Sequence, residues 1–137
     1  MWYCAHAIFY FKLKYKEEQE SYFIHENVYL VQANDADEAM EKSLEYAREE
    51  EDSTKNDSLV LNGKEPVCFI FAGIRKLITV DMSAGIRKLS DEDAALISDE
   101  DTPISGCELT YSELEVDTLE EVEKLANGEF VDVLYRM

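Results

Sequence analysis

The sequence predicts an α+β fold, with an antiparallel or mixed sheet of five or six strands and two helices packed on one face. Three observations lead to this prediction. Several segments combine β-branched and aromatic residues with two-residue alternation, which is typical of strands. Two other segments have apolar residues three and four apart, each after a capping residue. The strands are grouped with two helices of this kind, which is typical of an α+β layer with an antiparallel or mixed sheet.

The first segment, residues 2–14, alternates in the manner of a strand with two different faces. One face is wholly apolar and has two alanines in its middle, which would let a helix approach the sheet closely. It consists of Tyr3, Ala5, Ala7, Phe9, Phe11 and Leu13. The opposite face is mixed and consists of Trp2, Cys4, His6, Ile8, Tyr10, Lys12 and Lys14. A charged turn near Glu18 then leads to a second strand over 21–33.

Residues 34–51 predict the first helix. Asn34 or Asp35 can cap it, and Asp35 and Glu38 have the spacing of a capping box. Glu38 and Lys42 form a favourable pair four residues apart. The expected apolar stripe consists of Ala36, Ala39, Met40, Leu44 and Ala47, with Met40 and Leu44 facing the sheet.

The remaining elements are a hairpin turning at Asn62-Gly63, a strand over 67–80 expected near the sheet centre, and a strand over 107–116. Residues 117–130 predict the second helix, with capping-box spacing from Thr118 to Glu121 and Gly128 as the left-handed residue that ends it. A last strand is expected over 130–135. A length of 137 residues fits one domain, 1–137, with a surface excursion at about 82–106.

The hexapeptide AGIRKL occurs twice, starting at Ala72 and at Ala84. The first copy lies within the predicted strand over 67–80. The second is bracketed by serine and acidic residues, so its surroundings differ. We interpret the repeat as a duplicated strand segment, with copy one in the sheet and copy two in the surface excursion, and a doubled binding site as the less favoured alternative.

The charge balance limits the classes of partner. The chain has 31 acidic and 13 basic residues, a net charge of −18. This charge opposes direct binding to a nucleic-acid backbone and favours a basic protein partner. The apolar N-terminal run is too short to span a bilayer, so we expect no membrane association. Three scattered cysteines, Cys4, Cys68 and Cys107, favour reduced thiols and a cytoplasmic location.

Residues able to carry chemistry are few, and no catalytic motif, metal-ligand spacing or cofactor motif is present, so the sequence predicts no catalytic residue, metal or cofactor. With a turn near Glu18, His25 would lie opposite residue 11, too far from His6 to share a metal. Glu26 and Asn27 lie in an otherwise apolar strand, and a carboxylate there needs a partner. Either Glu26 pairs with Arg75, or it faces water at a sheet edge.

The segments WYCAHAIFYF, ENVYLVQANDADEAMEKSLEYAREEE, FAGIRKL and GCELTYSELEV together resemble a group of small bacterial proteins known only as a domain of unknown function. The shared pattern is a Trp-Tyr-x-Ala start, a Glu-Asn strand leading to an acidic helix, and a Gly-x-Glu-x-x-Tyr-Ser strand. The resemblance covers most of 2–81 and 106–116. It implies a cytoplasmic α+β domain and brings no established activity. The second AGIRKL copy is an addition to the pattern.

The leading functional hypothesis is a non-enzymatic binding protein, an acidic inhibitor or immunity-type partner of a basic protein. One alternative is a small-molecule binder or enzyme with a sheet-face pocket around Glu26, Asn27 and Arg75. A second alternative is an acidic nucleic-acid mimic. Because Trp2, Ile8 and Tyr10 share a face that helices on the other side would leave uncovered, a homodimer is also expected. The candidate binding residues are Trp2, His6, Tyr10, Glu26, Asn27 and Arg75.

Overall fold

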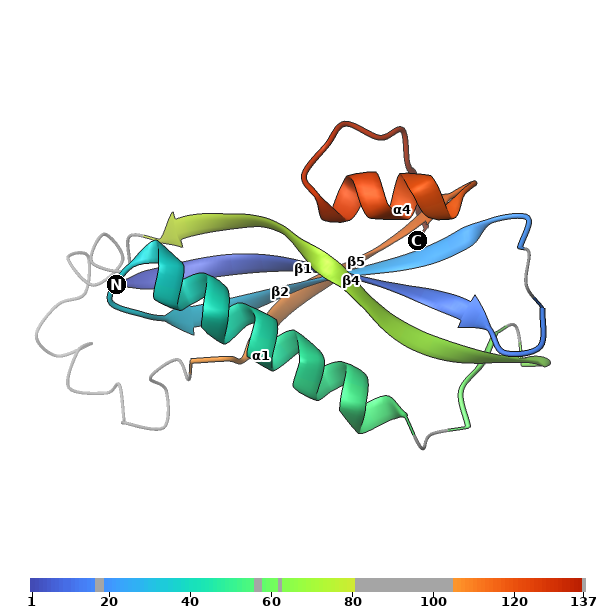
Figure 1. The fold of residues 1–137 in the computed structure, drawn as a ribbon, viewed down its shortest axis with the longest axis horizontal. Helices are drawn as coiled ribbons and strands as arrows, with labels where there is room; N and C mark the ends of the chain where they lie inside the picture. The colour runs from blue at the N-terminus through green and yellow to red at the C-terminus, as the bar shows by residue number, and fades with distance from the viewer. Residues whose placement is uncertain (17–18, 56–57, 62, 81–104, 137) are drawn as a thin grey trace, which may run out of the picture.

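The chain folds around one curled antiparallel sheet (Figure 1). The structure is a computed structural model, and it describes residues 1–16, 19–55, 58–61, 63–80 and 105–136. The elements are β1 (Trp2–Leu13), β2 (Tyr22–Gln32), α1 (Ala36–Thr54), β3 (Val60–Leu61), β4 (Glu65–Val80), β5 (Glu108–Val116), α4 (Leu119–Ala126) and β6 (Leu134–Arg136). The strand order is β3-β4-β1-β2-β5-β6, and every neighbouring pair is antiparallel. The predicted α+β class is therefore confirmed.

The two helices do not share a face of the sheet, which corrects the prediction that they would (Figure 1). The odd residues of β1 from Tyr3 to Phe9 are buried in one core with α1. Ile8, on the opposite face of β1, is buried in a second core with α4. The reason is that this second face has its own apolar residues on β2 and β5, which would remain in water without a cover.

Small residues position α1 on the sheet. Its fully buried residues are Ala39, Ser43 and Ala47, one turn apart, and the two alanines share a core with Ala5 and Ala7 of β1. Small side chains on both surfaces allow the helix to lie close to the strand. The stripe differs from the predicted one, since Met40 and Leu44 are only partly buried and Ala36 is exposed.

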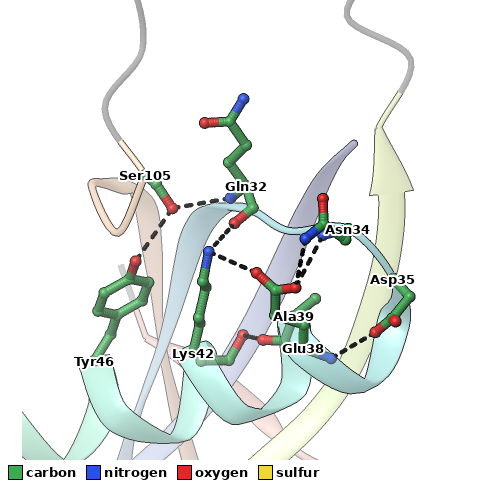
Figure 2. Close-up of polar contacts among 9 residues, drawn as sticks. Gln32, Asn34, Asp35, Glu38, Ala39, Lys42, Tyr46 and Ser105 are labelled. Carbon is green, nitrogen blue, oxygen red and sulfur yellow. Dashed lines mark hydrogen bonds and ion pairs between the residues drawn. The ribbon is translucent and has the colours of Figure 1, made fainter.

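The start of α1 is fixed by the contacts that its sequence predicts (Figure 2). Asp35 is the N-cap, and its Oδ1 accepts a hydrogen bond from the Glu38 amide at 2.8 Å. The Lys42 Nζ lies 3.0 Å from the Glu38 carboxylate and donates to the Gln32 carbonyl at 2.8 Å, which ties the helix to the end of β2. Ser105 Oγ accepts from the Gln32 amide and contacts the Tyr46 hydroxyl, so the chain leading into β5 is attached to both elements.

The second helix also begins and ends as predicted. Thr118 caps α4 and accepts a hydrogen bond from the Glu121 amide at 3.1 Å. Gly128 has a φ of 81°, so it is the left-handed residue that ends the helix. The last strand is shorter than expected, since only Leu134–Arg136 pair with β5, and 130–133 approach the sheet as a loop.

The strand that contains the first AGIRKL copy is less central than predicted. β4 pairs with β1 along its length, but within the described residues its other side pairs only with the two residues of β3, at Pro66 and Glu65. The Glu51 carboxylate of α1 accepts a hydrogen bond from the Phe71 amide of β4 at 2.5 Å. Copy one lies in β4, as predicted. Copy two and most of the predicted excursion fall outside the described residues.

Candidate functional site

The Glu26 cluster consists of His6, Glu26 and Arg75 and lies on the face of the sheet that α4 covers. Glu26 is only 8% exposed. Its Oε1 accepts a hydrogen bond from Arg75 Nε at 2.9 Å and lies 3.1 Å from His6 Nδ1. A carboxylate at this depth needs such partners, because removing an ion from water costs several kcal/mol. Of the two alternatives for Glu26, pairing with Arg75 is the one observed.

An irregularity in β4 places Arg75 in this cluster. The β1–β4 register shifts between His6, opposite Lys76, and Ala7, opposite Ile74. Arg75 is the extra residue at this shift, and its side chain turns toward Glu26. In a regular strand, side chains alternate strictly between the two faces. The extra residue interrupts this alternation, so the residues before and after it alternate out of step with one another.

A cavity of about 150 Å³ opens beside Glu26 and Arg75, beneath the loop that follows α4. It is smaller than the pockets of roughly 300–1,000 Å³ that hold drug-sized ligands. Burial lowers the pKa of His6 below its ordinary value, although the Glu26 carboxylate opposes this shift. His6 therefore favours its neutral form within the cluster. The cluster resembles a buried structural network more than an open site for chemistry.

Asn27 belongs to the other face, which corrects the expected pocket around Glu26, Asn27 and Arg75. Consecutive strand residues point to opposite faces. Asn27 Nδ2 consequently donates to Glu50 Oε1 on α1 at 2.9 Å, while Glu26 contacts Arg75 beneath α4. The structure thus brings Glu26, Arg75 and His6 together and keeps Asn27 apart from them.

Next to the contact between Asn27 and Glu50, some buried polar atoms have no hydrogen-bond partner within the described residues. The Asn27 Oδ1 atom and the Tyr29 hydroxyl are both buried, and neither has a hydrogen-bond partner within the described residues. Burial raises the pKa of Glu50 above its ordinary value, the nearby Glu108 carboxylate raises it further, and the bond from Asn27 opposes both. Ionised Glu50 is therefore partly disfavoured in the folded protein.

The two aromatic candidates on the α4 face have different surroundings. Tyr10 packs against the core under α4, with its ring 6.1 Å from that of Tyr22. Trp2 is half-buried at the far end of the strand. Because α4 covers Ile8 completely and packs beside Tyr10, the uncovered apolar face from which a homodimer was expected is reduced to the Trp2 end.

A second site, which sequence reasoning missed, lies on the α1 face at the opposite end of the strands. This aromatic pocket has a volume of about 310 Å³ and is lined by Phe11, Phe23, Ile24, His25, Leu61, Glu113 and Leu114. The predicted register was wrong by two residues, since His25 pairs with Phe9 and not with residue 11. That pairing places His25 on the opposite face from His6, among aromatic rings.

The geometry of the aromatic pocket does not provide a catalytic dyad. His25 Nε2 lies 3.7 Å from Glu113 Oε1, which is too long for a hydrogen bond. Rings surround the imidazole instead: Tyr111 lies 4.8 Å from it, Phe69 6.1 Å and Phe11 6.2 Å, between ring centres. Alternation does predict that Phe9, Phe11 and Leu13 share a face. Alternation within β1 does not show which strands pair with one another, and it is this pairing that brings His25 and Glu113 into the pocket.

The docking edge, defined here as residues Glu108–Glu113 of β5, adjoins this pocket. All six residues are exposed, whereas Leu114 and Val116 further along the strand are buried. On one side β5 pairs with β2, and on the other β6 pairs only with Glu113–Glu115. In the described part of the chain, no strand pairs with the outer side of 108–112. Leu109 and Tyr111 are 51% and 55% exposed there.

The described residues contain no group of three or more histidine, cysteine or acidic side chains that could hold a metal ion. None of the described helices is long and apolar enough to cross a membrane.

Comparison with known proteins identifies a family. No curated protein and no solved structure matches the chain. A family match covers residues 2–84, which span β1 to β4 together with α1, so β5, α4 and β6 lie beyond it. The match covers more than half of the chain and agrees with the resemblance noted from the sequence. The chain therefore belongs to the family described as a domain of unknown function, DUF4288.

Proposed function

We propose that this chain is a non-enzymatic binding protein that docks onto a basic protein partner through the docking edge. The observation that carries the proposal is the exposure of Glu108–Glu113, together with an outer side of 108–112 that no strand of the described residues pairs with. An exposed strand edge has unpaired amides and carbonyls that can pair with another chain. Natural sheets usually protect such edges with lysine or proline, and β5 contains neither.

The side chains of the docking edge suit a protein interface. Tyr111 and Leu109 provide apolar contact area, and tyrosine in particular is enriched in interface cores. Glu108 and Glu113 stand at the two ends, and the strand has no lysine or arginine to balance them. An acidic rim around apolar anchors favours a partner with basic residues at matching positions.

The mode of binding we propose is strand addition. An extended segment of the partner would pair with the outer side of 108–112 and extend the sheet beyond β5, next to β6. In this mode the main-chain hydrogen bonds supply affinity and alternate side chains supply specificity. The net charge of −18 would accelerate the encounter with a basic partner by electrostatic attraction.

A second copy of the chain fits this edge less well. Two copies would each bring a charge of −18 and an acidic strand edge, so their approach is opposed. A homodimer therefore remains the competing outcome. A nucleic-acid mimic would also bind a basic protein, but nucleic acid would then compete for that partner. The free state of Cys4, Cys68 and Cys107 suits a reducing bacterial cytoplasm as the location.

The experiment compares capture of host proteins by three forms of the purified chain. Wild type, Tyr111→Ser and Phe130→Ser are immobilised at equal density, and captured proteins are identified by mass spectrometry. Phe130 is the matched control, because it is a fully exposed aromatic residue in the loop after α4 and is not part of the docking edge. The captured protein is then purified, and its affinity is measured by calorimetry at several salt concentrations.

The proposal expects a stoichiometric basic protein that Phe130→Ser retains and Tyr111→Ser loses, with an affinity that falls as salt rises. It is overturned if no protein is captured in stoichiometric amount, if the partner is acidic, or if Tyr111→Ser binds as well as wild type. Competition by DNA for the same partner would instead identify the chain as a nucleic-acid mimic.

A further inference from the structure

We infer that the aromatic pocket receives one arginine side chain, supplied by the partner that binds the docking edge. This inference rests on the proposed function and names the group that would be recognised. The pocket and the edge share Glu113, and Tyr111 of the edge contacts the ring of His25 in the pocket. A side chain from a strand added beside β5 would have to cross only β5 to enter the pocket, since neighbouring strands lie about 4.8 Å apart.

The walls of the pocket suit a flat cation. Phe11, Phe23 and His25 contribute rings, and the whole pocket has a volume of about 310 Å³. Rings packed against one another hold these walls in place: Phe11 and Phe69 meet edge to face at 5.2 Å, and Phe9 and Phe69 lie 4.5 Å apart. A guanidinium group stacks on aromatic faces and is more weakly hydrated than an ammonium group, which favours arginine over lysine.

One carboxylate at the rim provides the matching charge. The Glu113 side chain is 50% exposed, and none of the seven lining residues is lysine or arginine. His25 Nε2 lies 3.7 Å from Glu113 Oε1, beyond hydrogen-bond distance, so the imidazole does not use the hydrogen-bonding capacity of this carboxylate. The planar fork of arginine can bind such a carboxylate with two hydrogen bonds.

The test titrates the full chain with three small probes: Nα-acetyl-arginine amide, Nα-acetyl-lysine amide and Nα-acetyl-citrulline amide. Citrulline has the shape of arginine without its charge. Binding is followed by NMR through the ring signals of His25 and Tyr111. Three forms are compared: wild type, Glu113→Gln and Glu120→Gln. Glu120 is the matched control, since it is an exposed acid on α4 that changes the net charge equally.

We expect arginine to shift the His25 and Tyr111 signals with the lowest Kd, lysine to bind more weakly, and citrulline to bind at least about tenfold more weakly than arginine. Glu113→Gln should raise the Kd for arginine about tenfold, and Glu120→Gln should leave it within about twofold. A tenfold change corresponds to about 1.4 kcal/mol.

Equal binding of citrulline and arginine, or equal effects of Glu113→Gln and Glu120→Gln, would overturn the inference. The first result would mean that the pocket recognises shape, and the second that only net charge matters. These failures are distinguishable from failure of the proposed function. If the probes do not bind the pocket but Tyr111→Ser still loses the basic partner, the docking edge stands and the arginine pocket does not.

Discussion

Glu26 is the single residue on which the α4 face depends most. Its carboxylate is buried and contacts both Arg75 and His6. Glu26→Ala leaves these two groups without their shared acceptor, and we expect a loss of about 2–3 kcal/mol in the free energy of unfolding. This lies below the roughly 3–5 kcal/mol typical of a fully buried pair because Arg75 remains partly exposed.

The measurement is urea unfolding, with Glu65→Ala as the control. Glu65 forms an exposed pair with Lys16 at 3.4 Å, so its loss should cost less than about 1 kcal/mol. In the double variant Glu26→Leu with Arg75→Met, apolar residues replace the pair, and most of the stability should return. Equal costs for Glu26→Ala and Glu65→Ala would show that the Glu26 cluster does not stabilise the fold.

Replacing Glu50, unlike replacing Glu26, is expected to raise the free energy of unfolding. Because burial raises its pKa above the ordinary value of 4.5, its contribution to stability is present below pH 4.5 and is lost as pH rises through the folded-state pKa. Glu50→Gln keeps an acceptor for Asn27 and removes the disfavoured charge. We expect this variant to be about 1 kcal/mol more stable than wild type at pH 7.

Urea unfolding at pH 4 and at pH 7 tests this prediction. At pH 4 wild-type Glu50 is protonated, so the two proteins should have similar stability. A Glu50→Gln variant that is less stable than wild type at pH 7 would show that ionised Glu50 stabilises its contact with Asn27.

Among the elements, α1 depends on small side chains. Ala39 and Ala47 lie fully buried in one core with Ala5 and Ala7 of β1. Ala39→Leu would insert three carbon atoms into this contact, and overpacking of this kind typically costs about 1–3 kcal/mol. Ala36→Leu makes the same change three residues earlier at an exposed position and should be nearly neutral. Thermal unfolding of both variants tests the packing, and equal melting temperatures would contradict it.

The end of α4 depends on a glycine for two separate reasons. Gly128 is left-handed with a φ of 81°, and a Cβ there would lie 3.0 Å from the Arg75 carbonyl oxygen of β4. Gly63 has a similar φ of 72° with nothing within 4 Å of its Cβ position. Gly63→Ala should therefore cost only the left-handed strain of about 1–2 kcal/mol, whereas Gly128→Ala should cost measurably more. Equal losses in urea unfolding would mean that the contact of α4 with β4 is not tight.

For the whole molecule, local patterns predicted the elements well. Capping residues, glycine positions and two-residue alternation lie within a few residues of the chain, so both helices, their caps and the strands could be recognised. The pairing of Glu26 with Arg75 was also anticipated as one of two alternatives, because a carboxylate in an apolar strand needs a partner.

Long-range features were less predictable. The face that each helix covers, the β1–β2 register and the shift at Arg75 depend on contacts between distant segments. The aromatic pocket depends on the β1–β2 and β2–β5 registers, since it joins Phe11 of β1, His25 of β2 and Glu113 of β5. The position of β4 away from the sheet centre was likewise not predictable, because its apolar composition is typical of a central strand.

Hydrogen exchange along β5 in the free chain, combined with sedimentation analysis, tests the central claim that this strand presents an open edge to a partner. We predict a monomer in which the amides of 109–112 that do not bond to β2 exchange rapidly, and in which those amides become protected when the captured basic protein is added. If the same amides are already protected in the free chain as strongly as those of β1, whether in a dimer or in a monomer, the edge is not open and the proposed docking surface is wrong.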